Sequence, residues 1–158
     1  ATFPEVNMKL DDFIAKHEGT KIDFDGAFGG QCVDLYRAYL KEVLGIPQSP
    51  KMKGAYEIWD TFDKKYFTAT KNTPAGVPSR GDIVIWNSKA GRGFGHVAVF
   101  LHGNVHKFTS LDQNWPTLSK VTLTEHTYSH VTGWLEPRLC RLTLDRLLSI
   151  SKNGTERK

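Results

Sequence analysis

The hydrophobic period of the chain changes near Gly81, and this change limits the folds open to it. From Cys32 to Leu44, apolar side chains recur at i, i+3 and i+4 and form one apolar face. Gly45 and Pro47 then end the predicted helix. Beyond Gly81, short runs of β-branched and aromatic residues replace this pattern. Helices followed by closely spaced strands predict an α+β fold with an antiparallel sheet.

Other predicted elements follow the same division. We expect helices over 9–18 and 54–63, and a connecting loop over 68–80, which is rich in Pro, Thr and Ser. Four short runs are typical of strands: 82–86, 96–100, 107–111 and 131–135.

The C-terminal segment differs from the rest of the chain. Leucines recur at mixed spacing over 139–150, before a polar end, which fits either a terminal helix or the start of a linker. We therefore predict one domain over 1–138 and a tail over 139–158.

Composition limits the classes of protein. A length of 158 residues suits one domain, and 39% hydrophobic with 24% charged residues is typical of a soluble globular protein. No apolar run is long enough to span a membrane, and no secretory signal is visible. The net charge of +4 favours an anionic partner, but acidic residues are interleaved and no basic block is present. We therefore expect a monomer that binds no nucleic acid.

The two cysteines are too far apart to form a spaced metal or redox pair. Cys32 and Cys140 are separated by 108 positions, and neither belongs to a C-x-x-C motif. Cys32 lies where a loop becomes a helix, and the free N–H groups of a helix start stabilise a thiolate. A reactive thiol and a small buried apolar residue are both compatible with this position.

An acidic loop precedes Cys32. With Asp23 as position 1, Asp25 is position 3, Ala27 is 5, Gly29 is 7 and Asp34 is 12, close to the ligand spacing of an EF-hand calcium loop. The loop lacks the usual glycine at position 6 and the usual Glu at position 12, so it is not a true EF-hand. A solvated acidic turn is the alternative.

His96 is the best candidate for a base. It follows a glycine and begins an apolar strand, where a core residue is normally aliphatic. The segment from Asp112 to Trp115 ends the next strand, and in antiparallel strands such an end lies beside the start of the preceding one. A carboxylate or amide there can orient His96. An ordinary core histidine and a plain turn are the alternatives, and His102 and His106 are expected on the surface.

Four segments stand out, in this order: Asp23-Phe24-Asp25-Gly26 with Gly30-Gln31-Cys32-Val33-Asp34, then Gly81-Asp82-Ile83-Val84, Gly95-His96-Val97-Ala98-Val99 and Asp112-Gln113-Asn114-Trp115. Together they resemble the CHAP domain, the cysteine, histidine-dependent amidohydrolase/peptidase family. The resemblance covers about residues 15–138 and is greatest to calcium-binding domains of bacteriophage endolysins and tail lysins.

The resemblance implies a papain-like fold and a set of roles. Cys32 aligns with the nucleophile and His96 with the general base and acid. Asp112 aligns with the acidic residue that orients the histidine, and Asn114 with an amide that completes the site. Gln31, together with the Cys32 backbone N–H, is placed to form an oxyanion hole.

The resemblance also implies a calcium ion and leaves one role open. Close relatives usually carry Glu where this chain has the shorter Asp112, so Asn114 is an alternative partner for His96. The aligned calcium ligands are Asp23, Asp25, Ala27, Gly29 and Asp34.

The function implied is hydrolysis of an amide bond in bacterial peptidoglycan, with a preference for endopeptidase action at the cross-bridge. An N-acetylmuramoyl-L-alanine amidase is the alternative, and a non-catalytic calcium-dependent wall-binding module is a different class of function. Such a protein is made in the host cytoplasm and acts on the cell wall, or is carried by the virion.

Overall fold

The computed structural model describes residues 7–26 and 29–138, which form small helices and one six-stranded sheet. The helices are α1 (Leu10–His17), α2 (Cys32–Tyr39), a π-helical segment (Leu40–Leu44), a 3-10 turn (Ala55–Glu57), α3 (Ile58–Thr61) and a second 3-10 turn (Gly91–Gly93). The strands are β1 (Phe67–Lys71), β2 (Ile83–Trp86), β3 (His96–Gly103), β4 (Lys107–Asp112), β5 (Thr122–Thr127) and β6 (Val131–Pro137).

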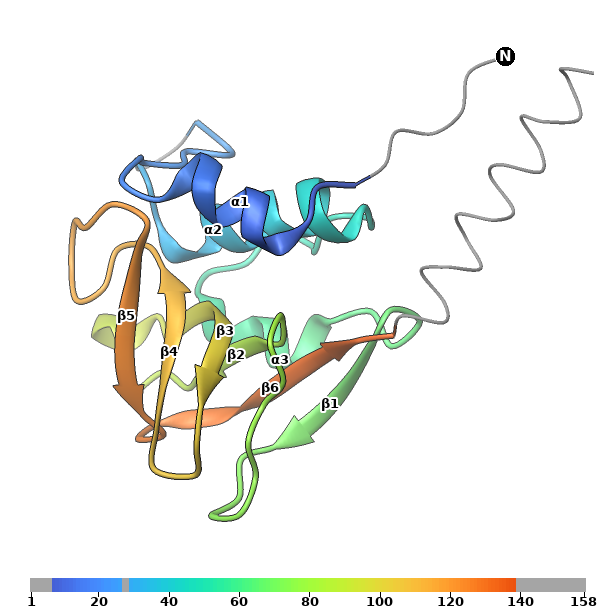
Figure 1. The fold of residues 1–158 in the computed structure, drawn as a ribbon, viewed down its shortest axis with the longest axis vertical. Coiled ribbons are helices and arrows are strands. Elements are labelled where there is room, and N and C mark those ends of the chain that lie inside the picture. Colours follow the sequence, from blue (N-terminus) through green and yellow to red (C-terminus); the bar gives the residue numbers. More distant parts are fainter. Residues whose placement is uncertain (1–6, 27–28, 139–158) are drawn as a thin grey trace, which may run out of the picture.

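The sheet has the order β1-β6-β2-β3-β4-β5, and every neighbouring pair is antiparallel. Helices α1 and α2 lie together over one side of it (Figure 1). The expected α+β class with an antiparallel sheet is therefore confirmed.

Helix α2 forms where the apolar stripe was found, but it changes type before its end. The Asp34 carboxylate accepts a hydrogen bond from the backbone N–H of Gln31 (2.8 Å), which satisfies one of the free donors at the helix start. After Tyr39 the chain continues as a π-helical turn and stops at Gly45, which adopts a left-handed φ of 65°. The predicted helix thus has the right extent, with a final turn that is wider than an α-helix.

Apolar residues are buried on both faces of the sheet. Between helices and sheet, Leu35 and Tyr39 of α2 pack in one cluster with residues such as Ile83. A second cluster on the other face contains Trp86 and Phe108. Because β2 contributes to both clusters, all four of its residues are buried and its sequence reads as an unbroken apolar run.

Two strands differ from expectation. The segment 68–80 was predicted as a loop, yet Phe67–Lys71 forms β1, and Thr122–Thr127 forms β5, which no pattern predicted. Both lie at edges of the sheet, and each buries only one side chain, Phe67 in β1 and His126 in β5. Since their other side chains are not buried, the apolar signal of a strand is missing.

One further predicted helix is shorter than expected, and the predicted tail cannot be compared with the structure. The helix expected over 54–63 is a 3-10 turn followed by four α-helical residues. The predicted tail over 139–158, with Cys140, lies outside the described residues. Across the described ranges, no helix has both the length and the apolar character needed to cross a bilayer.

Candidate active site

Cys32 is the first residue of α2 and is half-buried, and its side chain lies close enough to His96 to raise the pKa of that histidine. His96 is the first residue of β3 and is 1% exposed. Gly95 directly precedes His96; its φ is 72°, and a Cβ there would lie 2.7 Å from the carbonyl oxygen of Trp86, so the entry into β3 requires glycine at this position. The helix and the sheet therefore bring together the two residues that the sequence singled out.

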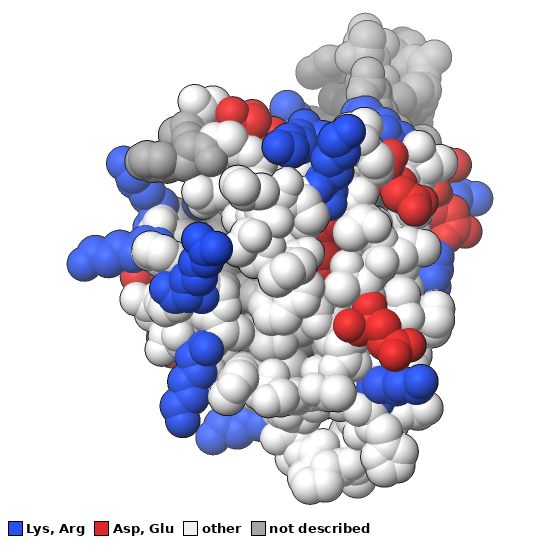
Figure 2. Space-filling view, turned by 90° about the vertical axis from the view of Figure 1, so that its left-hand side faces the viewer, with Lys and Arg blue, Asp and Glu red and all other residues white. Residues whose placement is uncertain are grey.

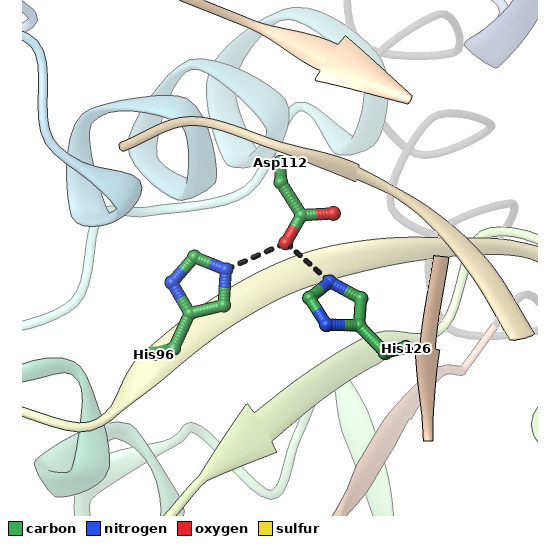
Figure 3. A group of neighbouring side chains, drawn as sticks. All are labelled: His96, Asp112 and His126. Atoms are coloured by element: carbon green, nitrogen blue, oxygen red, sulfur yellow. Dashed lines mark hydrogen bonds and ion pairs between the residues drawn. The ribbon is translucent and has the colours of Figure 1, made fainter. Parts of the chain in front are cut away.

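Asp112 lies against the far side of the His96 ring. Its Oδ2 accepts a hydrogen bond from Nε2 of His96 at 2.6 Å, and the carboxylate is fully buried (Figure 3). Strands β3 and β4 pair antiparallel, so the end of β4 lies beside the start of β3. Because Nε2 is engaged by Asp112, Nδ1 is the ring nitrogen left for the Cys32 thiol.

This arrangement favours the charged form of both groups. Burial alone lowers the pKa of His96, but its hydrogen bonds with Asp112 and Cys32 outweigh burial and raise that pKa to about 9. Burial alone raises the pKa of Asp112, but hydrogen bonds from two histidines hold it below its ordinary value. The site therefore favours an imidazolium at His96 next to an ionised carboxylate at Asp112.

The second histidine on Asp112 is His126, which the sequence had not distinguished from surface histidines. Its Nε2 lies 2.8 Å from the same Oδ2 atom, so the two rings converge on one oxygen (Figure 3). His126 comes from β5, the strand that showed no sequence pattern. Once β4 and β5 are paired, its register opposite Phe108, on the buried face, is the signal that identifies it.

Aromatic rings enclose the His96 ring. The ring centroids of Trp86 and Trp115 lie 4.9 and 4.6 Å from that of His96, and the two indoles lie 5.9 Å from each other. These contacts restrict rotation of the imidazole and keep water away from it. Trp115, in the segment that the sequence analysis placed beside His96, thus packs directly against that histidine.

Gln113 links the two halves of the site. Its side chain is fully buried; Nε2 donates to the carbonyl oxygens of Ile22 (2.8 Å) and Gln31 (2.7 Å), and Oε1 accepts from the N–H of Ile22 (2.7 Å). Ile22 directly precedes the acidic loop and Gln31 directly precedes Cys32. One amide therefore holds both ends of that loop against the end of β4, beside Asp112.

Asn114 and Gln31 occupy less central positions. The Asn114 Oδ1 accepts a hydrogen bond from the backbone N–H of Leu118, and the structure does not bring this side chain to His96. Asn114 also adopts a left-handed φ of 60°, so it forms a turn. Gln31 is exposed next to Cys32, and its backbone groups bond Gln113 and Asp34.

The acidic loop brings three carboxylates together. Oxygen atoms of Asp23, Asp25 and Asp34 all lie within 4.8 Å of one another. Asp34 is buried and accepts hydrogen bonds from backbone N–H groups, while the other two are exposed. Burial, together with the nearby charge of Asp25, raises the pKa of Asp34 despite these bonds. Ala27 lies outside the described residues, and Gly29 adopts a left-handed φ of 70°.

Similarity to other proteins supports both fold and family. The crystal structure of the wild type endolysin LysIME-EF1 matches with a TM-score of 0.59 and 22% identity, over 82% of this chain and 64% of that one. This likeness confirms the expected papain-like α+β fold. The endolysin PlyTW of Staphylococcus phage Twort is 27% identical over 166 residues, 95% of this chain and 33% of the phage protein.

Another relative is the endolysin LysK of Staphylococcus phage K, which is 34% identical over 102 residues, 62% of this chain and 20% of that protein. The chain thus spans a fifth to a third of these curated relatives. The model of the CHAP domain matches residues 22–114, more than half of the chain, and this segment contains Cys32, His96 and Asp112. The chain belongs to the CHAP domain family.

Proposed function

We propose that this chain is a peptidoglycan hydrolase whose nucleophile is Cys32. The observation that carries the proposal is the position of His96, which lies beside Cys32 and is hydrogen-bonded to the buried Asp112. Relatives with this domain are endolysins and an autolysin of Staphylococcus aureus, and such enzymes cleave the bacterial cell wall.

In the proposed reaction, the Cys32 thiolate attacks the carbonyl carbon of a peptidoglycan amide. The tetrahedral intermediate collapses to a thioester as His96 gives its proton to the leaving nitrogen, which departs as a free amine. Water then attacks the thioester; His96 takes one proton from it, and the carboxylic acid product leaves as the Cys32 thiolate is restored beside an imidazolium. Asp112 keeps the His96 ring in one tautomer through both steps.

We propose that the oxyanion of each intermediate is stabilised at the start of α2. The backbone N–H of Cys32 belongs to the free donors of a helix start, and the exposed Gln31 side chain lies next to it in sequence. Removing one such donor lowers turnover by about 100-fold to 1,000-fold in other acyl-transfer enzymes. Gln31→Ala is the variant that tests this role.

The cleaved bond is proposed to be a peptide bond of the cross-bridge. Mass spectrometry of digested walls distinguishes it from the bond between muramic acid and the stem peptide. New free amino termini on cross-bridge peptides support the endopeptidase proposal. Release of whole stem peptides from muramic acid would instead establish an amidase.

We propose that the acidic loop holds a calcium ion. Its three clustered carboxylates supply the hard oxygen ligands that calcium prefers, and two of them are exposed to solvent. Asp23, Asp25 and Asp34 would hold the ion, together with backbone oxygens of Ala27 and Gly29. The ion supplies positive charge that draws the loop together ahead of Cys32, and it takes no part in the bond-making steps.

The proposed partner is peptidoglycan, and the proposed state is a monomer acting at the cell wall. Lys and Arg side chains lie around the margins of the face shown in Figure 2, with an uncharged band through its middle. The charge on this face is therefore spread out, which fits a polymer bound along a neutral surface better than a nucleic acid bound on a basic patch.

Cys32→Ala tests the catalytic proposal. We expect the variant to keep the melting temperature of the wild type and to lose lysis of purified walls by at least about a thousandfold. Binding to walls, measured by sedimentation, should remain. A Cys32→Ala variant that lowers turbidity at the wild-type rate would identify the chain as a wall-binding module.

A further inference from the structure

Strand β5 buries a single side chain, and that side chain is a histidine. Its burial pattern leaves the other five residues partly or fully exposed, while His126 is 7% exposed. An apolar residue would fill this position without the free energy needed to remove an imidazole from water. A buried polar side chain on an edge strand therefore calls for a specific partner.

The partner of His126 is the catalytic carboxylate. Oδ2 of Asp112 lies 2.8 Å from Nε2 of His126 and 2.6 Å from Nε2 of His96, and Oδ1 accepts from the hydroxyl of Ser110. An ionised carboxylate only accepts hydrogen bonds, so each histidine must carry a proton on Nε2. The three donors together satisfy a carboxylate that has no contact with solvent.

These donors decide the charge of Asp112. A buried carboxyl group tends to be protonated, and a protonated Asp112 would itself donate, which would break the bond that orients His96. The hydrogen bond from His126 is the largest of the effects that lower the pKa of Asp112 against burial. Without it, His96 would be the main source of compensating charge, and that charge disappears each time His96 gives up its proton.

The His126 ring is held in the orientation that this bond needs. Ring centroids of Trp86, Trp115 and Phe108 lie 4.8, 5.0 and 5.4 Å from its own. The indoles of Trp86 and Trp115 also touch the His96 ring, so both histidines are packed against the same two side chains. His126, Asp112 and His96 are therefore held together as one rigid group.

We propose that His126 is a positioning residue, which donates to Asp112 so that this carboxylate stays ionised and directed at His96 throughout turnover. Two hydrogen bonds then link His96, Asp112 and His126 in that order, with Cys32 beside His96. This inference rests on the proposed catalytic roles of Cys32, His96 and Asp112, and His126 itself touches no reacting atom.

The test compares two substitutions of similar shape. His126→Gln keeps a side-chain N–H that reaches Asp112, whereas His126→Met fills the same space without a donor. We expect H126M to lower kcat about tenfold to a hundredfold with KM unchanged, the rate equivalent of one hydrogen bond to a charged group. H126Q should retain activity within a few-fold. His126 and the exposed His130 line the same surface pocket. His130→Asn is the matched control and should have no effect.

The pH dependence separates positioning from simple loss of packing. In H126M, Asp112 gains a proton at higher pH, so the acid limb of the activity profile should move to higher pH, while H126Q keeps the wild-type limb. Other titratable or charged groups facing His126 are His96 and, around the pocket, Lys89, Glu125 and His130. H126M and H126Q profiles with the same acid limb as the wild type would overturn the proposal.

A readout that does not use activity completes the test. In the Cys32→Ala background, ¹³C NMR of the Asp112 carboxyl should show a higher titration midpoint with H126M than with H126Q. If H126M does not fold, His126→Phe takes its place, and unchanged midpoints in a folded donor-free variant overturn the inference. A raised midpoint in H126M, together with a wild-type chain that fails to cleave walls, would contradict the proposed function and leave the role of His126 intact.

Discussion

Two acidic sites in the described part of the chain, Asp112 and the loop that contains Asp34, have opposite environments. Asp112 is fully buried at the end of a strand and is surrounded by side-chain donors from β3, β4 and β5. Asp34 is reached mainly by backbone N–H groups, and the neighbouring Asp23 and Asp25 are exposed on a loop. The Asp112 carboxylate is satisfied by hydrogen bonds from other side chains of the protein. The loop, by contrast, brings three carboxylates close together.

This difference assigns different tasks to the two sites. Donors fixed on strands keep their geometry during a reaction, which is what orientation of a catalytic histidine requires. Three carboxylates gathered on a loop offer the oxygen ligands that a hard cation prefers, which is what the proposed calcium site requires. A change at Asp112 should therefore act on turnover, and a change in the loop should act on the response to calcium.

The largest effect is expected at Asp112. Asp112→Leu has a similar volume but leaves two buried histidines without their acceptor, so we expect activity to fall by at least about a thousandfold. Asp112→Asn keeps a neutral acceptor oxygen, and a tenfold to hundredfold fall is expected for it, about the value of one charged hydrogen bond. Wall-lysis rates check both. Equal losses in the two variants would show that a neutral acceptor oxygen cannot replace any part of the role of the Asp112 charge.

Gln113 joins the two sites, and its removal should affect both. Gln113→Met leaves the backbone groups of Ile22 and Gln31 without partners, and we expect a loss of on the order of 3 kcal/mol in unfolding free energy. For a domain of this size that lowers Tm by roughly 10 °C. Gln48→Met, at an exposed amide, is the control and should change Tm by no more than about 1 °C.

Calcium should stabilise the wild type by a smaller amount. At 100 times its Kd, a ligand contributes about 2.7 kcal/mol, which raises Tm by roughly 5–10 °C in this domain. Asp25→Asn should remove most of this increase, while Asp112→Asn should keep it. Thermal melts with calcium and with EDTA provide the measurement. A wild-type Tm that is the same in both would exclude calcium binding by the loop.

The smallest effect concerns pH. His96 has a pKa raised from 6.5 to about 9, so the stability that its charged form contributes is fully present below pH 6.5 and is lost as the pH rises through 9. Activity and Tm should both decline over that upper range. His96→Gln should remove this part of the Tm profile. A Tm that stays constant from pH 7 to 10 in the wild type would contradict the ion pair with Asp112.

The sequence predicted the parts of the fold that bury regular apolar patterns. Helix α2 and the central strands β2 and β3 were found because their side chains face a core. Strands β1 and β5 were missed because edge strands expose most of their residues, and the pairing that defines them is non-local.

For the site, local motifs identified Cys32, His96 and Asp112, and the antiparallel pairing of strands placed Asp112 beside His96. The motif around Asp112 left open which of its polar residues faces the histidine. That choice depends on backbone conformation, here the left-handed turn at Asn114, which no spacing rule reveals. His126 lies in no motif and became visible only through the register of β5 against β4.

The buried amide of Gln113 has a consequence for how the protein is made. It joins positions that are 91 and 82 residues apart along the chain, so the loop before Cys32 is fixed only after β4 has been synthesised and has paired within the sheet. Contacts of such long sequence separation form late, because closing the intervening chain is entropically unfavourable. A nascent chain that has just reached Cys32 therefore does not yet hold this residue in position, and the proposed hydrolytic activity requires that β4 has joined the sheet.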